Sequence, residues 1–440
     1  MRRLIYDDLL KWKDSADRKP LLLEGVRQCG KTYLLRKFGS REFRNCVYCN
    51  FEETEELRGL FDGSHEPSRI VRDIELLYGT RIVPGETLLI LDEIQECGSV
   101  ASLEYTCEHM PGLHVACAGS LLGVLESEAF PMGNVDTKRL YPMSFCEYLM
   151  AEGETALADY ILSDPGPGDV SKPVHEALLR HLRDYCIVGG MPAAVLSWTT
   201  DHDIRTVDSI QKELLENYEK DIAKYGGDML ECLMSVWKAI PSFLSKENRR
   251  VVFKELKKDG RSEDFRDPMQ WLCNAGLVYK VDRITTHGYP PSTEQDESIY
   301  KVFSCDIGLL RAMAGHPARI MLTESDDTYL YKGGMYENLV VCELISAGAD
   351  RLFYWREGRY EVDLISSIGG KTVPIEVKSG TEFSTESLNL YQRKYHVSWG
   401  MVISARMPKE GNDRDMVPFY LAGNRQRAGP VLHDDASRSE

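Results

Sequence analysis

Short apolar runs alternate with longer amphipathic stretches along the first 150 residues. The runs lie at residues 21–23, 46–51, 88–91 and 114–118, and a less hydrophobic run follows at 138–143. The first four are mostly apolar, as strands are when helices cover both faces of a sheet. The intervening stretches have the length of helices, so the order of elements predicts a parallel sheet of βα units. We therefore expect an α/β domain over residues 1–150.

The rest of the chain predicts further domains, because 440 residues exceed the roughly 100–200 of a common single domain. The sequence patterns favour a helical connector at 151–229, a winged-helix-like domain at 230–325, a mixed α/β domain at 326–422 and a disordered tail at 423–440. The winged-helix prediction rests on three helical stretches followed by strand-like runs at 277–281 and 300–304. The predicted fold class is thus α/β multidomain.

Charge narrows the classes of partner. The chain has 53 Lys and Arg against 69 Asp and Glu, a formal net charge of -16. This excludes a uniformly basic nucleic-acid coat and disfavours binding to anionic membranes. Residues 331–440 carry 14 basic and 15 acidic groups and are nearly neutral, so a polyanion is tolerated better there.

The apolar runs and the distribution of cysteines predict the cellular compartment of the protein. The longest apolar runs fall far short of the ~20 residues that cross a bilayer, and no apolar signal segment follows the first residues. The 12 cysteines are scattered singly, which indicates reduced thiols. We expect a cytoplasmic protein with no membrane partner.

A phosphate-binding loop follows the first strand. Residues 25–32 fit G-x-x-x-x-G-K-[ST], with the required strand before and helix after. Glycines let backbone N–H groups wrap a phosphate at a helix N-terminus. Lys31 would pair with the β- and γ-phosphates of ATP, and the Thr32 hydroxyl would bind Mg²⁺. A chance glycine turn is the alternative. The predicted nucleotide-binding residues are Gly25, Val26, Arg27, Gln28, Cys29, Gly30, Lys31, Thr32 and Tyr33.

Two acids end the strand at 88–91. In open α/β sheets, ligands bind at the carboxyl ends of the strands. Asp92 would hold Mg²⁺ through its water shell, and Glu93 would orient and polarise the attacking water. Ser120 follows the next strand, where it would read the γ-phosphate or, equally, cap a helix.

Acidic residues also gather in the C-terminal domain. Asp363 is followed thirteen residues later by the triplet Glu376-Val377-Lys378 on a consecutive strand, and alternation puts Glu376 and Lys378 on one face. Glu337, on a preceding helix, would reach the same pocket. Asp363 and Glu376 would hold Mg²⁺ or Mn²⁺, with a lysine beside the attacking water. Such an arrangement forms a site for phosphodiester hydrolysis. An ordinary ion pair of Glu376 and Lys378 is the alternative.

A basic stretch lies within the acidic middle of the chain. Residues 245–261 hold the densest group of Lys and Arg there. They would form a DNA-facing helix of the winged domain, or merely a solvated helix face.

The stretches at residues 25–32, 88–95, 118–120 and 139–149 together resemble the archaeal-ATPase-like branch of the AAA+ ATPases, in the subgroup with an uncharacterised C-terminal domain. The resemblance implies ATP hydrolysis and places the Asp92 strand beside the strand that leads to Ser120. It also implies that Ser120 and Arg139 take part in catalysis, Ser120 as the sensor and Arg139 as a γ-phosphate sensor or arginine finger. A solvated strand end is the alternative for Arg139.

The C-terminal acids resemble the PD-(D/E)xK superfamily, which has the restriction-endonuclease-like fold. The first motif here reads Glu361-Val362-Asp363 instead of Pro-Asp. By this resemblance Glu337, Asp363, Glu376 and Lys378 are catalytic candidates.

Two functions follow from these patterns. The first is a Mg²⁺-dependent ATPase coupled to a nuclease-like domain that acts on DNA. The second is an ATP-dependent switch or scaffold whose nuclease-like domain is an inactive module that binds nucleic acid or protein. The sequence leaves open whether the chain forms a homo-oligomer and whether Arg139 acts in its own subunit.

Overall fold

The computed structural model describes residues 1–61, 66–94, 109–119, 135–315, 329–380 and 383–428. Ser120 lies outside these residues. The described chain forms two compact units, of which the first comprises residues 1–142 together with 270–277. The chain enters the second unit at Met143, before the expected domain boundary at residue 150. None of the helices in the described ranges is long and apolar enough to cross a membrane.

A five-stranded sheet forms the centre of the first unit. Its strand order is β2-β3-β4-β1-β5, and all neighbouring strands are parallel. The predicted parallel sheet is therefore confirmed, with the Asp92 strand β3 beside β4. The strands are β1 (Leu21–Glu24), β2 (Asn45–Asn50), β3 (Thr87–Asp92), β4 (His114–Gly119) and β5 (Asp136–Arg139).

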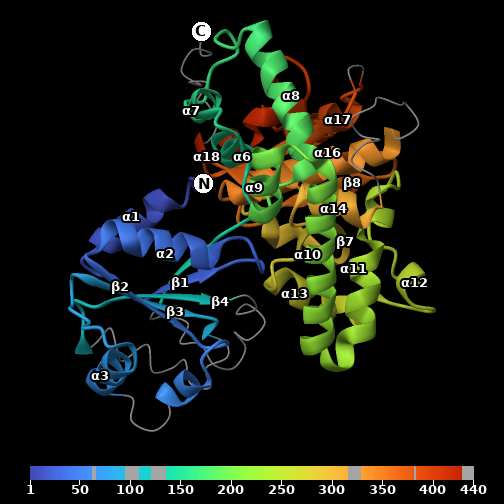
Figure 1. The fold of residues 1–440 in the computed structure, drawn as a ribbon. Helices are drawn as coiled ribbons and strands as arrows, with labels where there is room; N and C mark the ends of the chain where they lie inside the picture. Colours follow the sequence, from blue (N-terminus) through green and yellow to red (C-terminus); the bar gives the residue numbers. More distant parts are fainter. Residues whose placement is uncertain (62–65, 95–108, 120–134, 316–328, 381–382, 429–440) are drawn as a thin grey trace. The chain divides into compact units, whose positions relative to one another are not determined.

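Helices cover both faces of this sheet. Figure 1 shows α1 (Tyr6–Asp14) and α2 (Lys31–Glu42) on one face and α3 (Pro67–Tyr78) on the other. Side chains alternate along β3, so Leu89 and Leu91 join the core beneath α3, while Leu88 meets Gly39 of α2. Burial on both faces explains why β3 reads as a continuous apolar run.

The second unit begins with helices. Their bounds are α6 (Phe145–Glu152), α7 (Thr155–Leu162), α8 (Lys172–Val188), α9 (Pro192–Asp201), α10 (Ile204–Tyr225), α11 (Leu230–Leu244), α12 (Phe253–Leu256), α13 (Arg266–Asn274), α14 (Ile307–Met313), α16 (Tyr329–Ser346), α17 (Glu386–Tyr395) and α18 (Ala422–Ala428). The end of α13 clusters with the first unit.

A seven-stranded mixed sheet completes the second unit, in the order β12-β11-β10-β9-β8-β6-β7. The antiparallel pair β6–β7 follows α11–α13, which is the order of elements predicted for a winged helix. However, β6 also pairs in parallel with β8, so the expected boundary at residue 325 does not separate two sheets. The strands are β6 (Val278–Ile284), β7 (Gln295–Ser304), β8 (Phe353–Glu357), β9 (Tyr360–Ile368), β10 (Lys371–Lys378), β11 (Gly400–Ser404) and β12 (Arg414–Pro418).

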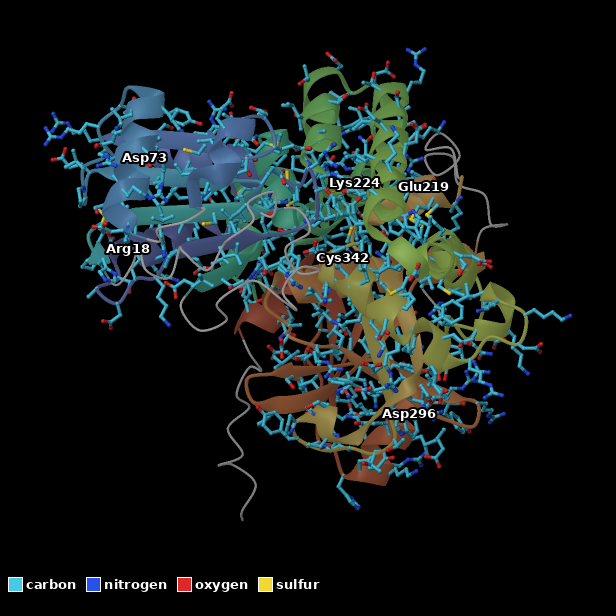
Figure 2. The ribbon with its side chains drawn as sticks, turned by 90° about the horizontal axis from the view of Figure 1, so that it is seen from below. Arg18, Asp73, Glu219, Lys224, Asp296 and Cys342 are labelled. Atoms are coloured by element: carbon cyan, nitrogen blue, oxygen red, sulfur yellow. The ribbon has the colours of Figure 1, made fainter. Side chains whose placement is uncertain are left out.

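Figure 2 draws the side chains of both units; Lys224 of α10, which it labels, is exposed. Several carboxyl groups of the second unit are instead buried, among them Asp306 and Glu343. Asp306 accepts hydrogen bonds from the backbone of Gly190 at 2.5 Å and Leu309 at 2.8 Å, and Glu343 accepts one from the backbone of Phe145 at 2.8 Å. Burial raises the pKa of Asp306 to about 6 and that of Glu343 to about 7.

These raised pKa values make the second unit less stable as pH rises. A carboxyl group whose pKa is raised by folding stabilises the fold below its unfolded pKa and loses that contribution as pH rises through the folded pKa. For Glu343 this interval runs from the ordinary 4.5 to about 7. Glu343→Gln keeps an acceptor oxygen and removes the charge. Urea unfolding should show the variant more stable than wild type by about 1–3 kcal/mol near pH 8, and equally stable near pH 5.

The exposed carboxylate of Glu216 on α10 offers a matched control. Glu216→Gln should change the free energy of unfolding by the same small amount at both pH values. An equal effect of Glu343→Gln at both pH values would contradict the assignment of a titrating, buried Glu343.

Candidate active site

Two glycines determine the shape of the phosphate loop between β1 and α2. Gly25 has φ 155°, and a Cβ there would lie 2.2 Å from the carbonyl oxygen of Leu140. Gly30 precedes α2 with φ 97°, in the left-handed region. Gly30 has no side chain to accept hydrogen bonds from the first turn of α2. The helix N-terminus therefore presents backbone N–H groups to an anion.

Side chains that donate hydrogen bonds to backbone carbonyl oxygens hold the phosphate loop in place. Lys31 is 6% exposed, and its Nζ donates to the carbonyl oxygens of Gly25 at 2.7 Å and Val26 at 3.1 Å. Arg3 donates to the carbonyl oxygen of Cys29 at 3.0 Å. The Cys29 thiol is buried. Lys31 thus lies within the loop whose N–H groups would hold the phosphates.

The metal-ligand candidates meet at the carboxyl end of β3. Thr32 Oγ1 donates to Asp92 Oδ2 at 2.6 Å, and Asp92 is 2% exposed. The structure thus brings together two hard oxygen donors, one from the phosphate-loop motif and one from the end of β3, 60 residues apart in sequence. This donor set fits Mg²⁺.

Glu93 follows with φ 52°, an uncommon left-handed conformation for a residue with a side chain. Its backbone N–H donates to Asp92 Oδ1 at 3.1 Å. Such conformations persist where surrounding contacts hold them, often at active sites. The geometry places Glu93 directly beside the metal-ligand candidate.

Arg139 lies on the edge strand β5, in register with Glu24 of β1. Its guanidinium is 3.3 Å from Glu24 Oε2. Glu24 immediately precedes Gly25, so Arg139 lies at the entrance of the phosphate loop in the same chain. Of the other loop residues, Gln28 is exposed and Tyr33 is 57% exposed.

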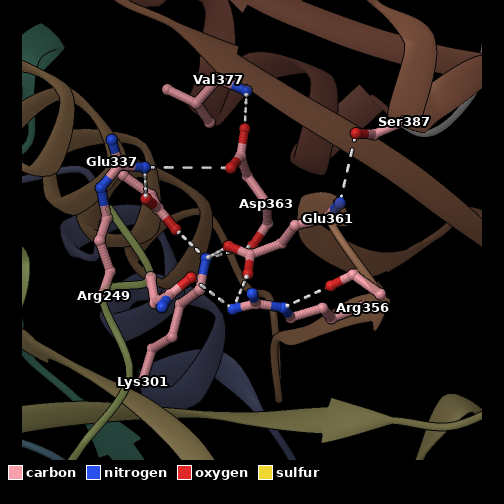
Figure 3. Close-up of polar contacts among 10 residues, drawn as sticks. Arg249, Lys301, Glu337, Arg356, Glu361, Asp363, Val377 and Ser387 are labelled. Carbon is pink, nitrogen blue, oxygen red and sulfur yellow. Dashed lines mark hydrogen bonds and ion pairs between the residues drawn. The ribbon is translucent and has the colours of Figure 1, made fainter. Parts of the chain in front are cut away.

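The C-terminal acids surround a buried lysine (Figure 3). Lys301 on β7 is fully buried, and its Nζ lies 2.7 Å from Glu337 Oε1 and 2.8 Å from Glu361 Oε1. Burial opposes the charge on Lys301, but Glu337 and Glu361 together with Asp363 raise its pKa above the ordinary value. Lys301 therefore stays cationic at any physiological pH.

A second cation joins this group. Arg249 forms an ion pair with Glu337 and lies 3.9 Å from Asp363 Oδ1. Asp363 Oδ2 also accepts a hydrogen bond from the backbone of Val377 at 2.8 Å. The structure thus brings Glu337 and Asp363 to one pocket, as expected, but it fills the space between them with a guanidinium.

Glu376 and Lys378 pair with each other, 3.3 Å apart. Glu376 Oε1 also accepts a hydrogen bond from the backbone of Leu388 in the first turn of α17, at 3.0 Å. Burial raises the pKa of Glu376 to about 7, although Lys378 opposes the shift. Glu376 is thus engaged by α17 as well as by its own strand.

Arg356 on β8 lies 3.6 Å from Glu361 Oε2, and we call it and the seven charged residues above the charge cluster. Four carboxylates face four cationic side chains, so the group is nearly neutral. Among the described residues, no group of three or more His, Cys, Asp or Glu side chains is arranged to hold a metal ion. The members are Arg249, Lys301, Glu337, Arg356, Glu361, Asp363, Glu376 and Lys378.

Sequence reasoning missed the two buried cations. It placed Arg249 in a basic stretch that would form either a DNA-facing helix or a solvated helix face, but residues 245–250 form no helix, and the Arg249 side chain is only 18% exposed. Lys301 was overlooked, although a single lysine in the apolar run 300–304 is a detectable signal. A lysine there requires a buried anion.

Family models match three parts of the chain. Residues 17–149 match a model described as an AAA domain, whereas residues 179–319 and 332–420 match domains of unknown function, DUF8612 and DUF4143. No curated protein matches the sequence. The first unit therefore contains the match to an AAA domain, including the phosphate loop, and the second unit matches families that define no activity.

Solved structures show only distant likeness. PCH-2 from C. elegans is 11% identical with a TM-score of 0.29, covering 49% of this chain and 67% of that chain. A RuvB variant from Thermotoga maritima is 16% identical with a TM-score of 0.30, covering 62% and 87%. Drosophila ORC bound to DNA is 13% identical with a TM-score of 0.27, covering 73% and 95%.

Removing the Lys301 ammonium from the charge cluster should destabilise the second unit. In Lys301→Met, Glu337 and Glu361 lose a buried partner, and such a loss costs about 3–5 kcal/mol. Denaturant unfolding should show this difference. Adding Glu337→Gln to Lys301→Met should recover part of it, because one uncompensated charge is removed.

The exposed Lys212 on α10 provides the control for this substitution. Lys212→Met should change the free energy of unfolding by no more than about 0.5 kcal/mol. A loss in Lys301→Met as small as that of the control would show that the cluster is not held together by Lys301.

Proposed function

We propose that the protein is a Mg²⁺-dependent ATPase whose nucleotide site is formed by the phosphate loop and the end of β3. The observation that carries this proposal is the 2.6 Å contact between Thr32 and Asp92. It joins Thr32, in the first turn of α2, to the buried carboxylate of Asp92 at the end of β3. Together with the AAA domain match, this is the arrangement that Mg²⁺-dependent cleavage of ATP requires.

Each residue of the site has a separate role. Lys31 would exchange its backbone acceptors for the β- and γ-phosphates, while the loop N–H groups hold them in place. Thr32 and Asp92 would hold Mg²⁺, which supplies charge neutralisation when it is bound. Glu93 would orient and polarise the attacking water. Arg139, anchored by Glu24, would stabilise charge that develops on the γ-phosphate.

Ser120 completes the proposed ATPase residues as the sensor that follows β4. Its role remains the sequence prediction, because it lies outside the described residues. The loop residues on either side of Lys31, from Gly25 to Tyr33, are proposed to contact the nucleotide through their backbone.

Two substitutions separate ATP binding from cleavage. Lys31→Ala should abolish binding of a fluorescent ATP analogue, because the Lys31 ammonium lies within the loop, where it would pair with the β- and γ-phosphates. Glu93→Gln should bind ATP like wild type, but its steady-state phosphate release should fall about 10²-fold or more. Equal turnover by Glu93→Gln and wild type would contradict the water-activating role of Glu93.

For the C-terminal domain, we propose a binding module that ATP turnover controls, instead of a nuclease. This proposal is supported by the charge cluster, in which Arg249, Lys301 and Arg356 already pair with Glu337, Glu361 and Asp363. A divalent cation would have to displace a fully buried ammonium, and breaking such a buried pair is costly. Metal-dependent cleavage at Asp363 and Glu376, with Lys378 beside the water, is the competing function.

Incubation with DNA distinguishes these two functions. Supercoiled and linear DNA should remain intact with Mg²⁺ or Mn²⁺, with or without ATP, and Asp363→Ala should behave like wild type. Agarose gels would reveal nicking or linearisation. Metal-dependent cleavage by wild type that Asp363→Ala abolishes would establish the nuclease and overturn the binding-module proposal.

A further inference from the structure

The Asp92 carboxylate accepts hydrogen bonds from three donors in the first unit. Thr32 Oγ1 and the Tyr48 hydroxyl both donate to Oδ2, at 2.6 and 2.8 Å. The backbone N–H of Glu93 donates to Oδ1 at 3.1 Å. Tyr48 lies on β2, the strand that pairs with β3, and the sequence motifs gave no reason to connect it with the site. Its hydroxyl is therefore an additional contact to a proposed metal ligand.

Asn50 determines the direction of the Tyr48 proton. The Asn50 Oδ1 atom accepts hydrogen bonds from the backbone of Glu52 at 2.9 Å and Glu53 at 3.1 Å. The amide orientation is thereby fixed, with Nδ2 donating to the Tyr48 oxygen at 3.2 Å. Since the Tyr48 oxygen accepts from Asn50, its own proton is directed to Asp92.

The Tyr48 ring is held by the helix that follows the phosphate loop. The Arg36 guanidinium of α2 lies 4.9 Å from the centre of the ring. The tyrosine is thus fixed at its ring by α2 and at its hydroxyl by Asn50. Few rotamers remain for it, so its donor is available without further ordering.

We propose that Tyr48, directed by Asn50, is a positioning residue that fixes the Asp92 carboxylate for the Mg²⁺ ion of bound ATP. Thr32 and Asp92 would hold the ion through their oxygen atoms, and Tyr48 would keep Asp92 Oδ2 in a fixed orientation for it. Outer contacts of this kind change metal affinity by about 10- to 100-fold. The inference rests on the proposed ATPase function of the same site.

The experiment measures how strongly Mg²⁺ and nucleotide bind together. The dissociation constant of a fluorescent, non-hydrolysable ATP analogue is determined with saturating Mg²⁺ and with EDTA, and the ratio of the two constants is compared between variants. Tyr48→Phe should bind the analogue in EDTA like wild type, because no phosphate contact changes. Its gain in affinity from Mg²⁺ should be about 10-fold smaller.

Tyr6→Phe is the matched control. The Tyr6 hydroxyl donates to Glu42 Oε1 at 2.7 Å, so the same atom is removed from a similar carboxylate contact in the same unit, away from the phosphate loop. This control should keep the full gain from Mg²⁺. A double-mutant cycle tests the role of Asn50. Asn50→Ala should reduce the gain in wild type and have no further effect in Tyr48→Phe.

The results separate the two levels of the proposal. If wild type gains affinity from Mg²⁺ and Tyr48→Phe gains as much, the positioning role of Tyr48 is overturned while the ATPase function stands. If wild type itself binds the analogue no better with Mg²⁺ than with EDTA, the proposed Mg²⁺-dependent ATPase function fails first. A Tyr48→Phe protein that binds more weakly in EDTA as well would show a general structural role and overturn the inference.

Discussion

Strand β4 lies between the strand that leads into the phosphate loop and the strand that carries Asp92, and all three are parallel. Parallel pairing brings the carboxyl ends of these strands to one edge of the sheet, where the N-terminus of α2 also begins. The nucleotide site depends on this arrangement. Thr32, in the first turn of α2, contacts Asp92, at the end of β3, although β4 lies between β1 and β3. The close approach of Gly25 to Leu140 ties the loop to the end of β5 in the same way.

The second unit is organised by compensation of buried charge. The acids of the charge cluster come from α16, β9 and β10, and its cations come from the turn after α11, β7, β8 and β10. A carboxylate in such a place is stable only with a partner, and here the partners are permanent parts of the chain. The same residue types that suggest a metal site in the sequence therefore serve, in the folded unit, to join its helices to its sheet.

The sequence predicted those features that depend on local pattern. The parallel sheet, the loop from Gly25 to Thr32 and the position of Asp92 at a strand end all follow from apolar runs and a motif of fixed spacing. The contacts of Tyr48 and Asn50 with the site were not predictable in this way. They depend on the pairing of β2 with β3, and the chain between these strands gives no sign of it.

The charge cluster also depends on contacts that local sequence pattern does not predict. Spacing alone brought Asp363, Glu376 and Lys378 together, but Arg249 lies 88 residues from its partner Glu337. The expected order of helices and strands before residue 305 is present, yet the pairing of β6 with β8 joins two predicted domains into one sheet. Long-range pairing decides both outcomes, and only a three-dimensional arrangement reveals it.

Anomalous scattering from a crystal grown with Mn²⁺ and a non-hydrolysable ATP analogue would locate the bound metal. We expect a Mn²⁺ peak beside Thr32 and Asp92, with none in the charge cluster, where Lys301 should keep its contacts with Glu337 and Glu361. A peak between Asp363 and Glu376, with Lys301 displaced, would contradict the assignment of a single metal site and restore the nuclease function.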